Sequence, residues 1–244
     1  MIINISETPE ELGRRAAALI AKLINEAIIS NGYARIVLST GKSQFETLDH
    51  LVQENVDWAK VEMFHLDEYV GIDENHPASF RKYLKERFVS RVNPGKVYFV
   101  TEEESIPALA ENLREKPVDV GVIGIGENGH IAFNDPPADF DTDEAYKVVT
   151  LDSRCRSQQV GEGWFRSINE VPEKAITMCV MEIMKARHIV SAVPHSTKAE
   201  AVWRTITTPL TPEVPATVLK SHEDWNLFLD QESASMLLGS RAHS

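Results

Sequence analysis

Apolar residues follow two different periods along this chain. Short continuous apolar runs predict buried strands, and apolar residues spaced three or four positions apart predict amphipathic helices. The runs predict strands at residues 2–5, 35–39, 61–66, 96–100, 118–125, 148–151, 175–180, 188–193 and 225–229. The spaced segments predict helices at residues 9–31, 44–51, 78–89, 106–114, 153–165, 182–186, 198–206 and 232–237. This alternation is typical of right-handed βαβ units around a mostly parallel sheet.

The run at 118–125, VDVGVIGI, is the most apolar of the predicted strands. Such continuous hydrophobicity is typical of a central parallel strand that is buried on both faces. An α/β fold can span a chain of this length as one domain, so we expect a single domain at residues 1–244. Residues 136–173 are the least regular part, and we interpret them either as a lid or as a plain surface excursion.

Composition narrows the class of protein. Hydrophobic residues make up 43% of the chain and charged residues 25%, which is typical of a folded protein. The net charge of −12 argues against a nucleic-acid partner but allows a phosphorylated small molecule that a few local donors hold. No secretory signal or membrane-length apolar run is visible, and two cysteines cannot form a disulfide framework. We therefore expect a soluble cytoplasmic enzyme with no membrane partner.

Two loops after predicted strands have the features of anion sites, and such loops lie at the edge of a parallel sheet where ligands bind. The first combines a flexible glycine with hydroxyls and a following helix start, and consists of Ser39, Thr40, Gly41, Lys42 and Ser43. It is not a P-loop, because Ile36 stands where that motif needs glycine, and a polar turn with a capping serine is the alternative. In the second loop, HSTKAEAV, Lys198 is either a phosphate ligand or an ordinary surface lysine.

A pair of acidic residues follows the predicted strand at 61–66, in the sequence FHLDEYVG. Asp67 and Glu68 lie in what we predict to be a polar loop, at the carboxyl end of a buried strand. A carboxylate there is partly desolvated and suits a general base. The alternative is that Asp67 caps a turn and Glu68 is solvated.

A histidine stands in the glycine-rich segment GIGENGHIAFNDPP. The segment contains G-x-G-x-x-G, but two prolines at 136–137 prevent the helix that a dinucleotide site needs. A loop can instead fold Asp135 back to orient the imidazole of His130, with Asn128 and Asn134 close by. The alternative is a turn histidine that is hydrogen-bonded for packing. No H-E-x-x-H pair or paired cysteine motif occurs, so we expect no metal.

Five segments together resemble the glucosamine-6-phosphate deaminase/isomerase family. They are LSTGKS, FHLDEYVGI, GIGENGHIAFNDP, the lysine of HSTKAEAV, and PATVLKSH, and they cover nearly the whole chain. The related 6-phosphogluconolactonases share the architecture and the Gly-His element but differ after that histidine. The resemblance implies a three-layer Rossmann-like fold with a mostly parallel sheet, helices on both faces and a lid segment.

The resemblance also implies a hexosamine 6-phosphate substrate and no organic cofactor or metal. The family reaction opens the sugar ring, moves a proton between C2 and C1, and releases ammonia to give fructose 6-phosphate. The resemblance implies that Asp67 is the base for this proton, that His130 assists ring opening and that Asp135 orients His130. Residues 39–43 and Lys198 would then hold the phosphate.

This chain departs from the family pattern at several positions. Many members have aspartate where Asn128 stands and glutamate where Asp135 stands. Asn128 brings no negative charge to His130, and Asp135 is one methylene shorter. The family's lid arginine falls within LDSRCRSQQVGEGWF, where a glutamine occupies the position in one register, and the neighbouring Arg154 and Arg156 are candidate replacements.

Three functional hypotheses follow. The first is an amino-sugar phosphate deaminase/isomerase, and the second is a lactonase-type hydrolase that uses the same histidine to activate water. Asp67 discriminates between them, because isomerisation needs a base at C2 and lactone hydrolysis does not. The third is a catalytically weak sugar-phosphate sensor, which Asn128 and Asp135 motivate. The sequence leaves open the sugar epimer and the oligomeric state, a homo-oligomer included.

Overall fold

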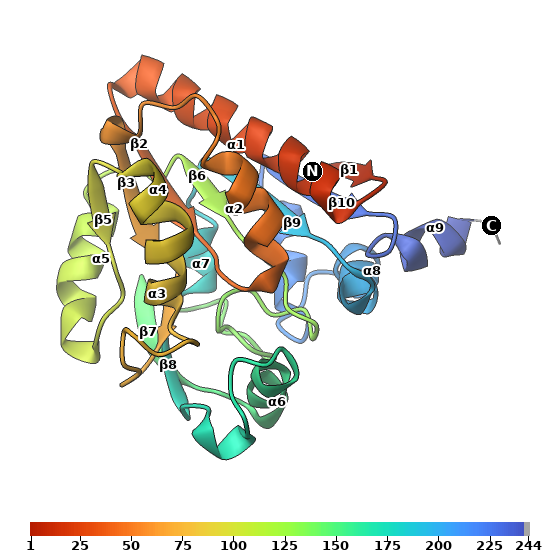
Figure 1. The fold of residues 1–244 in the computed structure, drawn as a ribbon. Coiled ribbons are helices and arrows are strands. Elements are labelled where there is room, and N and C mark those ends of the chain that lie inside the picture. The colour runs from red at the N-terminus through yellow and green to blue at the C-terminus, as the bar shows by residue number, and fades with distance from the viewer. Residues whose placement is uncertain (242–244) are drawn as a thin grey trace.

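A seven-stranded parallel sheet forms the centre of the computed structural model, which describes residues 1–241 (Figure 1). The strand order is β1-β10-β9-β6-β2-β3-β5. In chain order these strands are β1 (Ile2–Ser6), β2 (Ala34–Leu38), β3 (Val61–His65), β5 (Lys96–Tyr98), β6 (Val120–Val122), β9 (His188–Val193) and β10 (Trp225–Asp230). The prediction of a mostly parallel α/β sheet is therefore confirmed.

Two apolar clusters lie on opposite faces of this sheet, which gives the fold three layers. Successive strand residues face opposite sides, so in β2 Ile36 and Leu38 join one cluster while Val37 joins the other. Two helices, α1 (Pro9–Asn31) and α2 (Phe45–Leu51), cover the first face, and Figure 1 shows α2 lying beside α1. Residues of α5 (Ile106–Arg114), α7 (Val180–Ile183) and α8 (Ala199–Thr207) fill the cluster on the second face.

The long first helix begins and ends where its sequence predicts. The side-chain oxygen of Thr8 accepts a hydrogen bond from the N–H of Glu11, and Pro9 takes the first helical position. Gly32 ends the helix with a φ of 82°, a left-handed conformation that glycine adopts without steric cost. Two further short helices, α3 (Phe80–Leu84) and α4 (Ser90–Val92), frame a π-turn at Lys85–Val89. The last helix is α9 (Ser235–Arg241).

A second, smaller sheet lies beyond the carboxyl ends of the main strands. It contains β4 (Asp67–Tyr69), β7 (Tyr146–Thr150) and β8 (Lys174–Met178), all antiparallel, in the order β4-β8-β7. The prediction of a polar loop at residue 67 is wrong, because β8 supplies a partner strand more than a hundred residues away. The strand predicted at 118–125 is also shorter than expected, since only Val120–Val122 pair and the chain then turns into a loop.

The segment 136–173 contains β7, α6 (Ser153–Gly161) and a 3₁₀ turn at Ile168–Glu170. Figure 1 shows α6 apart from the helices that cover the main sheet, beyond the ends of β7 and β8. A third apolar cluster attaches the segment to β4, with Cys155 and Phe165 packed against Tyr69 and Phe133. The apolar pattern predicts no helix or strand at Pro215–Ser221, where the structure has a 3₁₀ segment that connects α8 to β10. No helix in residues 1–241 is long and apolar enough to cross a membrane.

Candidate active site

A cavity of about 930 Å³ opens at the carboxyl ends of β2, β3, β6 and β9. All four sequence segments that we singled out line it, together with the segment that contains α6. The residues that were predicted to form the site and that line the cavity are Ser39, Thr40, Gly41, Lys42, Ser43, Asp67, Asn128, His130, Arg154 and Lys198. The fold therefore brings together residues that lie up to 159 positions apart in the sequence.

The carboxylate of Asp67 faces this cavity from the first position of β4. Its residue is only 5% exposed, and no group within residues 1–241 donates a hydrogen bond to the carboxylate. Burial, together with the negative charge of Glu68, raises the pKa of Asp67 well above the ordinary range for aspartate. A largely buried carboxylate without protein donors is a stronger base once it is ionised, because fewer hydrogen bonds stabilise its charge.

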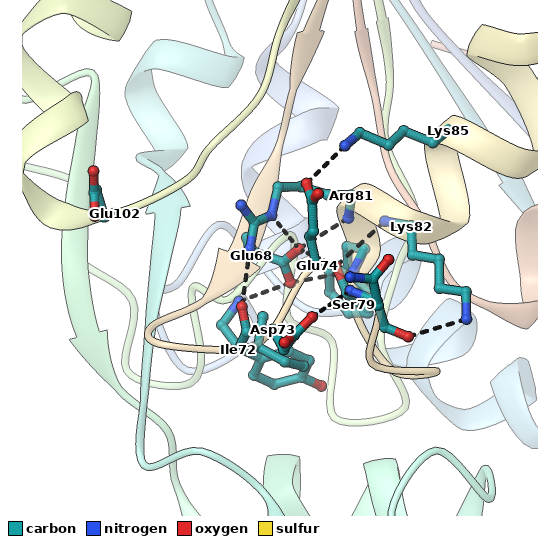
Figure 2. Close-up of polar contacts among 12 residues, drawn as sticks. Glu68, Ile72, Asp73, Glu74, Ser79, Arg81, Lys82, Lys85 and Glu102 are labelled. Atoms are coloured by element: carbon teal, nitrogen blue, oxygen red, sulfur yellow. Dashed lines mark hydrogen bonds and ion pairs between the residues drawn. The ribbon is translucent and has the colours of Figure 1, made fainter.

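Glu68, the next residue, has the opposite environment. It is fully buried, and its Oε1 accepts hydrogen bonds from the N–H groups of Tyr69 (3.0 Å) and Phe80 (3.2 Å). Its Oε2 accepts from the Ser79 hydroxyl at 2.9 Å and from the Arg81 N–H at 2.9 Å, and the Arg81 guanidinium lies 3.4 Å away (Figure 2). The alternative of a turn-capping aspartate beside a solvated glutamate is therefore wrong.

The imidazole of His130 lies on the opposite wall and packs flat against the backbone of Gly126. A Cβ at position 126 would lie 2.2 Å from the ring, so only glycine leaves room for it. Gly129 adopts a φ of 88°, which turns the chain back toward Gly126. The glycines of GIGENGH thus make space for a histidine ring instead of a pyrophosphate.

Asp135 reaches His130 despite its short side chain. Its Oδ1 lies 3.3 Å from the ring Nδ1 and accepts a hydrogen bond of 3.3 Å from the Asn128 amide. The approach to Nδ1 is an ion-pair distance without hydrogen-bond alignment, and Oδ2 has no partner. Burial would raise the pKa of Asp135, but the contacts with His130 and Asn128 outweigh it and hold that pKa below the usual range.

The loop that carries His130 is fixed to the second sheet through β8. The N–H of Phe133 donates to the Thr177 hydroxyl at 3.1 Å, and the Asn134 amide donates to the Met178 carbonyl at 2.9 Å. Asn134 therefore has a structural part in the site and does not face the cavity. Since β4 also pairs with β8, one strand holds both Asp67 and the His130 loop.

The anion-binding features gather at the other end of the cavity. Lys198 is 7% exposed and forms no hydrogen bond or ion pair within the described chain, and burial lowers its pKa. The Ser39 hydroxyl is likewise buried without a partner. A buried ammonium next to an open loop of hydroxyls and N–H groups is an anion site, because an unpaired buried charge is costly.

Two features of this end were not predicted. His195, just before the Ser-Thr-Lys sequence, lines the cavity with a φ of 79°, and its N–H donates to the Asp230 carboxylate at 2.9 Å. Trp164 in the 136–173 segment lies under the Lys42 ammonium, 5.7 Å from the ring centre. The position of His195 next to the predicted Lys198 loop could have indicated that it lies in the site, whereas no local sequence pattern indicates this for Trp164.

The two lid arginines have different surroundings. Arg154 lines the cavity, but Arg156 does not, because its guanidinium donates to the carbonyls of Ile168 and Val171. Gln159 also lines the cavity, and its side-chain carbonyl is buried without a hydrogen-bond partner. Within segment 136–173, Gln159 and Arg154 therefore line the cavity and Arg156 does not.

Comparison with known proteins identifies relatives over almost the whole chain. The family model for glucosamine-6-phosphate isomerases/6-phosphogluconolactonase matches residues 7–227. Glucosamine-6-phosphate deaminase of Lactobacillus delbrueckii subsp. bulgaricus is 34% identical over 243 residues, covering 97% of this chain and 100% of the relative. The deaminase of Thermoanaerobacter sp. is 34% identical over 254 residues, covering 97% of this chain and 95% of the relative.

Solved structures give the same grouping. A monomeric glucosamine-6-phosphate deaminase superposes with a TM-score of 0.88 at 29% identity, covering 96% of this chain and 99% of the other. A 6-phosphogluconolactonase from Shewanella baltica has a TM-score of 0.80 at 20% identity, covering 94% and 97% of the two chains. The latter similarity concerns the fold alone.

We expect Lys198→Ala to weaken the binding of sugar phosphates strongly. A charge-assisted contact typically contributes about 1.5–3 kcal/mol, which corresponds to roughly a 10- to 150-fold rise in Kd. Isothermal titration with a sugar phosphate would measure this, with Lys22→Ala on the exposed face of α1 as the matched control. An unchanged Kd in Lys198→Ala would contradict the assignment of the anion site.

Proposed function

The chain belongs to the glucosamine-6-phosphate isomerase/6-phosphogluconolactonase family, and we propose that it converts an amino-sugar 6-phosphate to the ketose 6-phosphate with release of ammonia. The observation that carries this proposal is the carboxylate of Asp67, which lies in the wall of the cavity and accepts no hydrogen bond from residues 1–241. Such a group suits the transfer of a carbon-bound proton, which needs a strong base close to the substrate.

The cavity provides a site for each part of the substrate. The phosphate binds between residues 39–43 and Lys198, where the buried ammonium gains the counterion that it lacks. The sugar then extends toward Asp67 and His130, which line the same cavity. Arg154 or Gln159 contacts the substrate from the lid. Arg156 does not contact the substrate in this arrangement, because its guanidinium donates to the Ile168 carbonyl.

The reaction begins with ring opening. His130 moves the proton between the ring oxygen and the C1 hydroxyl, and the nearby Asp135 stabilises the positively charged imidazole. Asn128 holds Asp135 through its amide, so it serves as a neutral hydrogen-bonding partner. A single carboxylate thus stands beside the ring in this chain.

Proton transfer between carbon atoms follows. Asp67 removes the proton from C2 and returns it to C1, so that the amine-bearing carbon becomes an imine carbon. Water adds to that carbon, and ammonia leaves to give the C2 ketone. Overall, C2 loses one hydrogen and C1 gains one, the nitrogen leaves as ammonia, and no redox partner is needed.

Lactone hydrolysis is the second candidate, because the fold is shared with 6-phosphogluconolactonases. A lactonase needs His130 to activate water but has no use for a carbon base. The donor-free Asp67 therefore favours the deaminase. A sugar-phosphate sensor would bind the same ligands without turnover.

We also propose that residues 1–244 act as one catalytic domain with 136–173 as its lid. The support is the cavity lining by Arg154, Gln159 and Trp164, and the contact of Trp164 with Lys42. A cytoplasmic enzyme fits Cys155 and Cys179, which are both free and buried.

The function is tested by ammonia release from glucosamine, galactosamine and mannosamine 6-phosphates, with 6-phosphogluconolactone hydrolysis measured in parallel. We expect ammonia from the glucosamine or galactosamine substrate and no lactone turnover above background. Lactone hydrolysis alone would favour the hydrolase, and binding without any turnover would favour the sensor.

We predict that Asp67→Asn abolishes exchange of the C2 proton with solvent while it preserves substrate binding. A positioned acid–base group typically contributes about 10²–10⁴-fold, and asparagine keeps the shape without the basicity. Loss of deuterium from C2-labelled substrate would measure this, with the exposed Asp73→Asn as control. Exchange at a near wild-type rate would place the base elsewhere.

We predict that Asp135→Asn lowers kcat more than it raises KM. The carboxylate lies 3.3 Å from the ring of His130 and stabilises positive charge there during ring opening, which is a transition-state contact more than a ground-state one. Steady-state kinetics would separate the two constants, and Asp139→Asn, on an exposed ion pair with Lys147, is the control. An unaltered kcat would remove Asp135 from the mechanism.

A further inference from the structure

Two neighbouring carboxylates in β4 have unequal surroundings, and this inequality carries a further inference that rests on the proposed function. Asp67 and Glu68 are consecutive residues of a strand, so their side chains leave on opposite faces. Asp67 faces the cavity with no donor in the described chain, whereas Glu68 accepts hydrogen bonds from three backbone N–H groups, a hydroxyl and a guanidinium.

The donors to Glu68 are preorganised by the next helix. Ser79 is the N-cap of α3, so the N–H groups of Phe80 and Arg81 belong to the helix's first turn and have no intrahelical acceptor. The same Arg81 also donates to the Ile72 carbonyl at 2.9 Å, which closes the loop between β4 and α3 (Figure 2). Burial raises the pKa of Glu68, and these donors oppose that rise because each of them stabilises the ionised carboxylate.

Four titratable groups that lie on the same side of the cavity as the pair hold no charge at neutral pH. Burial raises the pKa of three of them, which are Tyr69 on β4, Tyr146 on β7 and Cys155 on α6. Burial and the charge of Arg81 lower the pKa of His65 on β3 to about 3. Across the cavity lie His130 with Asp135, and Lys198 with Glu127 and Glu162. Within residues 1–241, Glu68 and Arg81 are therefore the charges that act on Asp67 from its own side.

We infer that Glu68 is a positioning residue for the proposed base: it fixes β4 against α3 and places its negative charge behind Asp67, which makes Asp67 a stronger base. Both roles have the same cause, because the donors that hold Glu68 in place also favour its ionised form. Arg81 limits the effect, since its guanidinium offsets part of that negative charge.

The test is the titration of the Asp67 carboxyl carbon by NMR in labelled protein, with Asp67→Asn to assign the signal. In Glu68→Gln we expect the midpoint to fall by on the order of one pH unit. The acidic limb of kcat/KM should move the same way, since that limb reports the base in the free enzyme. In Arg81→Gln we expect a smaller shift of both quantities in the opposite direction.

Ser79→Ala is the matched control, because it removes a neutral donor from Glu68 and leaves every charge in place. We expect lower thermal stability with an unmoved midpoint. If Glu68→Gln fails to fold, Arg81→Gln carries the test. An unmoved or reversed midpoint in either folded variant overturns the inference, as does a loss of activity without a shift of the limb. The NMR titration needs no substrate, so it still decides the matter if the proposed deaminase activity is not found.

Discussion

The geometry of this site depends on the hydrogen bonds that the buried carboxylate of Glu68 accepts. A charge inside a protein is tolerated only when donors replace the water that it has lost. Here the donors come from β4 itself and from the first turn of α3, so the hydrogen bonds to Glu68 attach β4 to α3 and fix the position of the strand. Asp67 precedes Glu68 directly, and its position in the cavity wall follows from that attachment.

Folding makes the charged forms of two residues in the site, Asp67 and Lys198, less favourable. The raised pKa of Asp67 means that the folded chain prefers the protonated form, so its contribution to stability falls as pH rises from the unfolded pKa toward the folded one. The lowered pKa of Lys198 means that its contribution to stability falls as pH drops from the unfolded pKa toward the folded one. A bound anion offsets the cost of burying the Lys198 ammonium, so binding of an anionic ligand stabilises the folded chain.

The sequence was sufficient for the elements whose pattern is local. The helix at 106–114 and the strand at 188–193 have the predicted bounds, because each is set by its own apolar period and its own end signals. β4 was missed because two acidic residues have low strand propensity, and only pairing with the distant β8 makes a strand there. The surroundings of Glu68 and Arg156 were not predicted for a related reason: each has hydrogen-bond partners 11 to 15 residues away, at the start of α3 and around the 3₁₀ turn at Ile168–Glu170, and no periodicity encodes such contacts.

The residues proposed to hold the phosphate and those proposed to act on the sugar differ in their attachment to the second sheet. The loop 39–43 and Lys198 follow β2 and β9 of the main sheet, whereas Asp67 and the His130 loop are both fastened to β8 of the small sheet. Asp67 and the His130 loop also follow β3 and β6 of the main sheet, so β8 is a second attachment that both of them share. A change in β8 would therefore reach the proposed base and the histidine at the same time, and it would leave the loops after β2 and β9 attached to the main sheet alone.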